Sequence, residues 1–254
     1  MGINPTRNFD LLYIMFDTAF LLVFMGLLIW KKKYLTVLWA LFGGILYFIV
    51  DFGYFYLISG SRTVSVNGIV SGGGVTALVL LWMSLSYGIT NFAFIWLCLG
   101  RDENLKEWLI LIIGWWIAAP SLVLNGSGTV ITTFRTTSAY HGVMAAILII
   151  GYLAAIIYNL KSENKKIPVL RLNAIGFSVQ FFWEFALLVN GIRPLNGASI
   201  VTLIINSCIE TNLGMPYIFL IYCFITGRLQ ENLKPAENSG GSETEETERE
   251  TALI

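Results

Sequence analysis

The stretch SVQFFWEFALLVNG, residues 178–191, places one acid, Glu184, inside an otherwise apolar and aromatic run. Runs of about 20 apolar residues are long enough to cross the ~30 Å hydrocarbon core of a bilayer. The whole chain shares this character: 56% of its 254 residues are hydrophobic and only 13% are charged. Soluble domains carry about a quarter charged residues. The sequence therefore predicts an all-α membrane protein of seven transmembrane helices, at approximately 10–30, 35–59, 76–99, 108–124, 139–160, 172–191 and 199–226.

Basic residues are unevenly shared between the two ends of these helices. The loops 31–33, 101–107 and 161–171 and the start of the tail hold most of them, and such an excess marks the cytosolic side. The opposite side has Arg7, Arg62, Arg135 and Arg193. This asymmetry predicts an outward N-terminus and a cytosolic C-terminus. The membrane is expected to be the cell membrane in a prokaryote or the endoplasmic reticulum in a eukaryote.

The chain divides into a transmembrane domain, 1–229, and a tail, 230–254. The tail is acidic and rich in Gly and Ser, which predicts disorder. Within the domain, YFIVDFGYFYLISGSR (47–62) aligns with QFFWEFALLVNGIRP (180–194), so that Asp51 falls on Glu184 and each helix ends in Gly-x-Arg.

The third and seventh predicted helices align as well, with Gly88 on Gly214. These matches predict a parallel internal repeat of 3+1+3 helices. Its units span about 10–100 and 139–228, and the linking helix spans 108–124.

Five ionisable residues lie inside the predicted helices, each toward the outer side. They are Asp17, Asp51, His141, Glu184 and Glu210. No Lys or Arg accompanies the acids within the helices, and a charge in the bilayer costs at least ~2.5–3.5 kcal/mol. We therefore expect some of the acids to stay protonated and to meet in one chamber open to the outer side. In the competing structural interpretation, a protonated acid only bonds a neighbouring helix. His141 is expected to be an interfacial residue and not a metal ligand.

Polar and aromatic side chains accompany the acids. Tyr47, Gln180 and Asn206 each precede an acid by four residues and so share its helix face. Aromatic rings crowd the same helices and could stabilise cationic species. The predicted substrate-binding residues are Tyr47, Tyr87, Asn91, Gln180, Trp183 and Asn206.

An acid in an aromatic second helix and acid-x-x-x-Gly in the seventh resemble the seven-helix membrane terpene cyclases of fungal meroterpenoid pathways and their bacterial relatives. The stretches SYGITNFAFIW (86–96), KEW (106–108) and LRLNAIGF (170–177) are also similar. The resemblance implies that Asp51 and Glu210 protonate an epoxide or alkene to start cyclisation. The chain departs from the family pattern in having Val50-Asp51 instead of Trp-Glu, Glu210 instead of Asp, and Trp183-Glu184 in the sixth helix. Glu184 is thus a third candidate catalytic acid.

The resulting expectation is an enzyme that cyclises a lipophilic polyprenyl or epoxy-polyprenyl substrate. No diphosphate leaves in such a reaction, so neither a metal ion nor another cofactor is expected. No nucleic-acid partner is expected either. Two alternatives remain open from the sequence: a small-solute transporter built on parallel three-helix repeats, and a seven-helix sensor. The oligomeric state is open as well.

Overall fold

The computed structural model describes residues 6–123, 126–135, 141–162, 167–195 and 197–232. Most of these residues are helical. Six helices in the described ranges are long and apolar enough to cross a membrane: Leu11–Trp30, Tyr34–Ile58, Gly73–Gly100, Leu105–Val123, Gly142–Lys161 and Val169–Val189. The helix-rich architecture and six of the seven expected apolar helices are thereby confirmed. Of the predicted tail, 230–254, residues 230–232 are helical, and 233–254 lie outside the described residues.

These six spans correspond to named elements. They are α1 (Leu11–Trp30), α2 (Tyr34–Phe48) continued by a π-helix, η1 (Ile49–Ile58), α3 (Gly73–Gly100), α4 (Leu105–Ala118) continued by a 3₁₀ turn, η2 (Ala119–Val123), α5 (His141–Lys161) and α6 (Val169–Val189). The bounds agree with the expected ones to within a few residues. The π-helix was not expected; such segments are rare and frequently occur at functional sites.

The expected seventh helix, 199–226, is not continuous. It is divided into α7 (Gly197–Ile209) and α8 (Met215–Asn232), with a turn at 210–214 between them. Pro216 has no backbone N–H to continue a helix and instead occupies the first turn of α8, where that N–H is not needed. At 1.5 Å per residue, α7 is only ~20 Å long, which is too short to span the hydrocarbon core. Met1–Pro216 and Tyr217–Ile254 form separate compact units.

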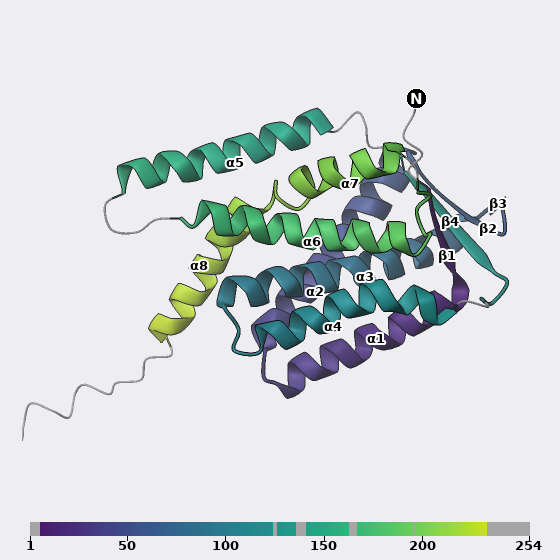
Figure 1. Ribbon diagram of the computed structural model, residues 1–254, viewed down its shortest axis with the longest axis horizontal. Helices are drawn as coiled ribbons and strands as arrows, with labels where there is room; N and C mark the ends of the chain where they lie inside the picture. The colour runs from purple at the N-terminus through teal and green to yellow at the C-terminus, as the bar shows by residue number, and fades with distance from the viewer. Residues whose placement is uncertain (1–5, 124–125, 136–140, 163–166, 196, 233–254) are drawn as a thin grey trace, which may run out of the picture. The chain divides into compact units, whose positions relative to one another are not determined.

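A small sheet departs from the all-helical prediction. It consists of β1 (Arg7–Asp10), β2 (Arg62–Val66), β3 (Ile69–Val70) and β4 (Val130–Arg135), in the antiparallel order β1-β4-β2-β3. The β2–β3 hairpin turns at Asn67 and Gly68, whose φ angles are both positive. Asn-Gly is the preferred pair for such a two-residue turn. In Figure 1 the strands gather at the end of the unit where α1 and α3 begin.

The opposite end of the helices carries a different contact. Lys33, after α1, lies 2.7 Å from a carboxylate oxygen of Asp102, which follows α3. The loops between α1 and α2 and between α3 and α4 therefore meet at the end away from the sheet (Figure 1). Lys33 thus lies at the opposite end of the helices from Arg7, Arg62 and Arg135.

Helix α3 runs through the centre of the bundle, and its second half is almost completely buried. Its closest neighbour is α2, which it approaches at Gly44 and Gly88. A Cβ added to Gly88 would lie 2.6 Å from the Cα of Gly44, so only glycine allows the two backbones this distance. Small residues at such crossings let membrane helices pack closely.

The α2–α3 crossing yields the first prediction. Gly88→Ala should lower the melting temperature of the detergent-solubilised protein by several degrees, because the new Cβ meets backbone that cannot turn away. Overpacking of this kind costs about 1–3 kcal/mol. Gly26→Ala on α1 is the matched control, since no atom lies within 4 Å of its added Cβ. Equal melting temperatures for the two variants would contradict the close approach.

Candidate functional site

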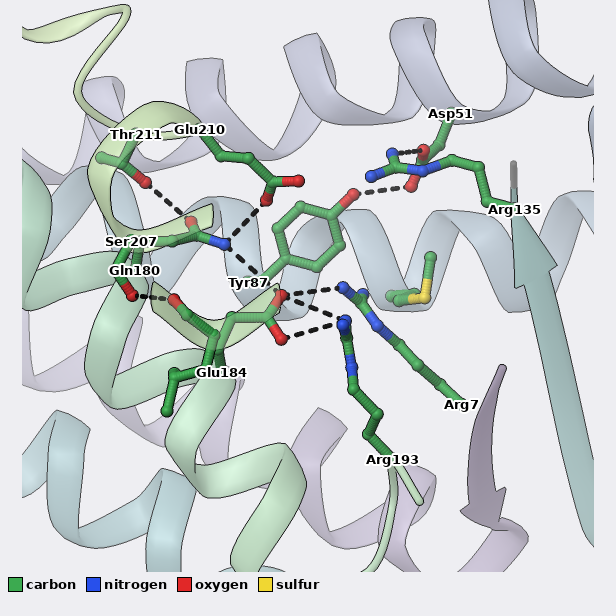
Figure 2. A network of polar contacts seen from close by, with 12 residues as sticks. Arg7, Asp51, Tyr87, Arg135, Gln180, Glu184, Arg193, Ser207, Glu210 and Thr211 are labelled. Atoms are coloured by element: carbon green, nitrogen blue, oxygen red, sulfur yellow. Dashed lines mark hydrogen bonds and ion pairs between the residues drawn. The ribbon is translucent and has the colours of Figure 1, made fainter. Parts of the chain in front are cut away.

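Four arginines from the sheet end of the bundle reach the acids of the helices. Arg7 lies on β1, Arg62 begins β2, Arg135 ends β4, and Arg193 follows α6. Figure 2 shows the guanidinium groups of Arg7 and Arg193 beside Glu184 and that of Arg135 beside Asp51. We call the four arginines together with Asp51, Glu184 and Glu210 the arginine–carboxylate cluster. The expectation that the acids lack basic partners is wrong for Asp51 and Glu184, because arginines outside the helices supply the counter-charge.

Asp51 is shared by two of these arginines. Nη2 of Arg62 lies 3.2 Å from Oδ2 of Asp51, and Nη1 of Arg135 lies 2.8 Å from Oδ1. The hydroxyl of Tyr87 donates a third hydrogen bond to Oδ2 at 2.6 Å. Asp51 is only 1% exposed and lies in the first turn of the π-helix that begins at Ile49. A carboxylate with two arginines and a phenol as donors is held in its ionised form.

Glu184 has a corresponding arrangement on α6. Nη2 of Arg193 lies 2.9 Å from Oε2 and 3.1 Å from Oε1, and Nη2 of Arg7 lies 3.5 Å from Oε1. The amide Nε2 of Gln180, one helical turn earlier, lies 3.5 Å from the same oxygen. Glu184 is fully buried. Two arginines therefore share each of the two buried carboxylates.

The Gly-x-Arg motif explains how two of these pairs form. Gly60 and Gly191 have φ angles of +60° and +67°, a left-handed conformation that favours glycine and ends a helix. The chain turns back at each glycine, and the arginine two residues later meets the acid of the same helix. The partners are 11 residues apart for Asp51–Arg62 and 9 apart for Glu184–Arg193.

Glu210 has a different environment. It lies in the turn after α7, outside the six membrane-length helices, and its Oε2 accepts a hydrogen bond from Nε2 of Gln180 at 2.7 Å. The other end of that amide, Oε1, accepts a bond from the Thr211 hydroxyl at 2.8 Å. Within the described part of the chain, Glu210 makes no ion pair within 4 Å. It is the exception among the three acids of the cluster.

The protonation of Glu210 follows from its neighbours. Loss of hydration on burial, and then the negative charge of Glu184, raise the pKa of Glu210 above its ordinary value, while Arg135, Arg7 and Arg193 oppose this shift. Part of the residue surface remains exposed, but protein atoms surround the carboxyl group. The surroundings of Glu210 therefore favour its protonated form.

Burial and neighbouring charges shift the pKa values of Arg62, Arg135 and Arg193. Burial lowers the pKa of Arg62 to about 10 against the opposing charge of Asp51, and burial likewise lowers the pKa of Arg193. Burial also acts on Arg135, but the carboxylates of Asp51 and Glu210 more than compensate and raise its pKa. The cluster thus combines four positive charges with two ion-paired carboxylates and one further acid.

Aromatic rings connect the acids. The rings of Tyr47 and Tyr87 lie 4.6 Å apart, those of Tyr87 and Trp183 5.9 Å, and those of Trp183 and Trp116 5.6 Å. Tyr87, whose hydroxyl binds Asp51, stands in the close-up of Figure 2 among the charged residues. The predicted residues Tyr47, Tyr87 and Trp183 therefore form one continuous set of rings beside the cluster.

The remaining predicted residues occupy different positions. Gln180 connects Glu210 with Glu184, and Asn91 is a buried residue of α3 within hydrogen-bonding reach of Tyr47. Asn206 is buried on α7, where its carbonyl accepts the backbone N–H of Glu210 at 2.8 Å.

Asp17 does not share the arginines. Its Oδ2 accepts a hydrogen bond from Nε1 of Trp82 at 3.0 Å, and its Oδ1 accepts one from Nε1 of Trp115 at 2.8 Å. The expectation of one chamber for all five ionisable groups is therefore wrong for Asp17, whose carboxyl is satisfied by indoles. The side chain of His141 lies outside the described residues.

Comparisons with protein-family models, with curated proteins and with solved structures give no significant match. The likeness to membrane terpene cyclases therefore rests on the short motifs of this chain alone.

The shared carboxylates generate the second prediction. Asp51→Asn should destabilise the protein by about 3–5 kcal/mol, because it leaves Arg62 and Arg135 close together in a buried place without their counter-charge. Adding Arg62→Met to Asp51→Asn should recover part of this loss by removing one of the two cations. Chemical unfolding in detergent measures both variants.

Asp102→Asn, which breaks the ion pair with Lys33 at the opposite end, is the control and should cost less. If the double variant is no more stable than Asp51→Asn alone, the unpaired arginine charges are not the cause of the lost stability.

Proposed function

We propose that this chain is a membrane-embedded enzyme of terpene-cyclase type, in which Glu210 starts cyclisation of a polyprenyl or epoxy-polyprenyl chain by donating a proton. The observation that carries the proposal is the contrast among the three acids of the cluster. Asp51 and Glu184 are each paired with two arginines, whereas Glu210 is bonded by the Gln180 amide and has a raised pKa. A general acid requires its proton, and the surroundings of Glu210 favour the protonated form.

The environment of Asp51 gives it another role than the one implied by the family resemblance. A carboxylate that accepts bonds from two guanidinium groups and a phenol is a poor proton donor. Asp51 and Glu184 instead hold the arginines in place. Asp51 also positions Tyr87, and Glu184 positions Gln180, which hydrogen-bonds Glu210. Asp51 and Glu184 are thus positioning residues in this proposal.

The reaction balances without a cofactor. Protonated Glu210 transfers its proton to an alkene carbon, or to the oxirane oxygen as the C–O bond breaks, and a carbocation forms on the substrate. Double bonds of the same chain attack the cation and close rings, while the faces of Tyr47, Tyr87 and Trp183 stabilise it electrostatically. Loss of a proton from carbon ends the cascade, and Glu210 takes up that proton and is ready for the next cycle.

The third prediction tests the proton donor. Purified protein incubated with polyprenyl and epoxy-polyprenyl substrates should give cyclic products, measured by mass spectrometry. Glu210→Gln should reduce turnover by about 10²–10⁴-fold, the usual contribution of a general acid, with an unchanged melting temperature. Since the donor must be protonated, the rate should fall as the pH rises through the pKa of Glu210.

Glu107→Gln, in the first turn of α4 and outside the cluster, is the matched control and should keep the wild-type rate. Absence of product from the wild type, or full turnover by Glu210→Gln, would refute the proposal.

We also infer that the sheet end faces outward and the Lys33–Asp102 end faces the cytosol, as the distribution of basic residues predicts. The fourth prediction follows, in a background where the exposed Cys208 and Cys223 are replaced by Ser. Ile69→Cys on β3, 75% exposed, should react with a membrane-impermeant maleimide in intact cells. Glu103→Cys, 78% exposed at its side chain, should react only after permeabilisation. The reverse labelling pattern would show that the sheet end faces the cytosol and would refute the inferred topology.

The parallel repeat supports a second candidate, a small-solute transporter. Asp51 with Arg62 and Glu184 with Arg193 are built alike, each through a left-handed glycine. The close crossing of Gly44 with Gly88 has a counterpart in Gly176, where an added Cβ would meet Asn212 and Met215. Two corresponding units around one polar region are typical of repeat-built carriers. Solute uptake into proteoliposomes without cyclic products would favour this candidate.

A further inference from the structure

We infer that the arginine–carboxylate cluster binds an anionic group, a carboxylate or a phosphate, at one end of an amphiphilic substrate whose hydrocarbon chain lies against the aromatic rings. The inference rests on the proposed function for the nature of that chain, but the binding of the anion follows from the cluster itself.

The first support is the balance of charge. Arg7, Arg62, Arg135 and Arg193 bring four positive charges, and the ion-paired carboxylates of Asp51 and Glu184 return two negative ones. Even an ionised Glu210 leaves one positive charge in excess, and a protonated Glu210 leaves two. Uncompensated charge among buried groups is costly, so an anion of one or two charges is the natural complement.

The second support is hydrogen-bonding capacity that the protein itself leaves unused. Nε of Arg62 and Nε of Arg193 are buried and have no hydrogen-bond partner among the described residues. The two residues are 4% and 5% exposed. Guanidinium groups present their N–H donors in a fixed fork that fits the oxygens of carboxylates and phosphates. Buried donors of this kind normally have partners, so their vacancy points to a ligand.

The third support is the route into the cluster. The side chains of Arg7 and Arg135 are 12% and 21% exposed, whereas those of Arg62 and Arg193 are 3% and 6% exposed. The cluster is therefore most accessible at Arg7 and Arg135, on the end that carries the sheet. In this proposal a head group entering there meets the arginines first, and a chain attached to it continues toward Tyr87 and Trp183.

Glu210 connects this binding with the proposed chemistry. Its carboxyl group faces Arg7 from β1, Arg135 from β4, Arg193 and Glu184 from α6 and the loop after it, and Tyr47 from α2. An ionised Glu210 competes with an incoming anion for the same arginines. A bound anion consequently favours the protonated form of Glu210, which is the form that can donate a proton.

The fifth prediction tests the head group with defined probes in detergent micelles. Farnesoic acid and farnesyl phosphate should bind at least 10-fold more tightly than neutral farnesol, measured by the ligand-induced rise in melting temperature and by calorimetry. Inorganic phosphate, which shares the charge but lacks the chain, should bind more weakly than farnesyl phosphate. If inorganic phosphate binds as tightly as farnesyl phosphate or more tightly, the cluster is a site for free anions, and the proposed binding of an amphiphile is refuted.

Variants sharpen this test. Arg7→Met removes the arginine with the longest ion-pair distance, 3.5 Å, and leaves the Arg193–Glu184 pair intact, so the protein should fold. It should weaken farnesoic acid binding about 10-fold and leave farnesol binding unchanged. Arg101→Met, in the loop after α3 at the opposite end, is the matched control and should change neither. Unchanged affinity in Arg7→Met, or equal affinity of the wild type for farnesol and farnesoic acid, would refute the inference.

The two proposals fail in different ways. Glu210→Gln should lose turnover but bind farnesoic acid at least as tightly as the wild type, because it removes the competing carboxylate. A protein that binds anionic amphiphiles and makes no cyclic product would refute the cyclase and retain the head-group site. A protein that cyclises its substrate while binding farnesol as well as farnesoic acid would refute the head-group site alone.

Discussion

The sharing of two buried carboxylates by four arginines is the constraint on which the rest of the structure depends. Asp51 and Glu184 belong to helices, whereas Arg7, Arg62 and Arg135 belong to the sheet. The ion pairs therefore fasten the sheet onto one end of the bundle and also define the polar region beneath it. Removing either acid leaves two cations without counter-charge, whereas each acid keeps a second arginine when one is removed. Neither Asp51 nor Glu184 could therefore be changed alone at low cost.

Local irregularities of the helices place the acids where the arginines can reach them. Asp51 lies in the π-helical continuation of α2, and Glu210 lies where a long apolar stretch breaks between α7 and α8. Non-helical backbone inside a protein persists only where other groups satisfy its N–H and C=O groups. The turn at 210–214 meets this condition through backbone bonds such as Leu213 to Ile209 and Gly214 to Thr211. Both departures from regular helix thus coincide with the cluster.

The sequence predicts the apolar helices well because their length and composition are set by the bilayer alone. It predicts the neighbourhood of Asp51, Glu184 and Glu210 only in part. The arginines were identified as the basic residues of one side, yet their pairing with the acids depends on the chain reversing at Gly60 and Gly191, which no hydropathy pattern reveals. The Gly-x-Arg repeat was the available signal. Likewise Asn67-Gly68 marked the hairpin, but strands of four to six residues carry little periodicity beside long apolar helices. The break in the seventh helix depends on the backbone hydrogen bonds of the turn at 210–214, and Pro216 alone does not predict it.

The parallel repeat that the sequence predicts would account for the difference between Glu210 and the two arginine-paired acids. The alignment that places Gly88 on Gly214 also places Ser84 on Glu210. Ser84 is completely buried on α3, and its hydroxyl has no hydrogen-bond partner among the described residues. Both halves of the predicted repeat thus carry an arginine-paired acid, while a titratable group at the second position is present only in the latter half. The proposed proton donor therefore has no counterpart in the first half. That asymmetry suits the proposed catalyst acting on an oriented chain better than a carrier that must present equivalent faces to both sides.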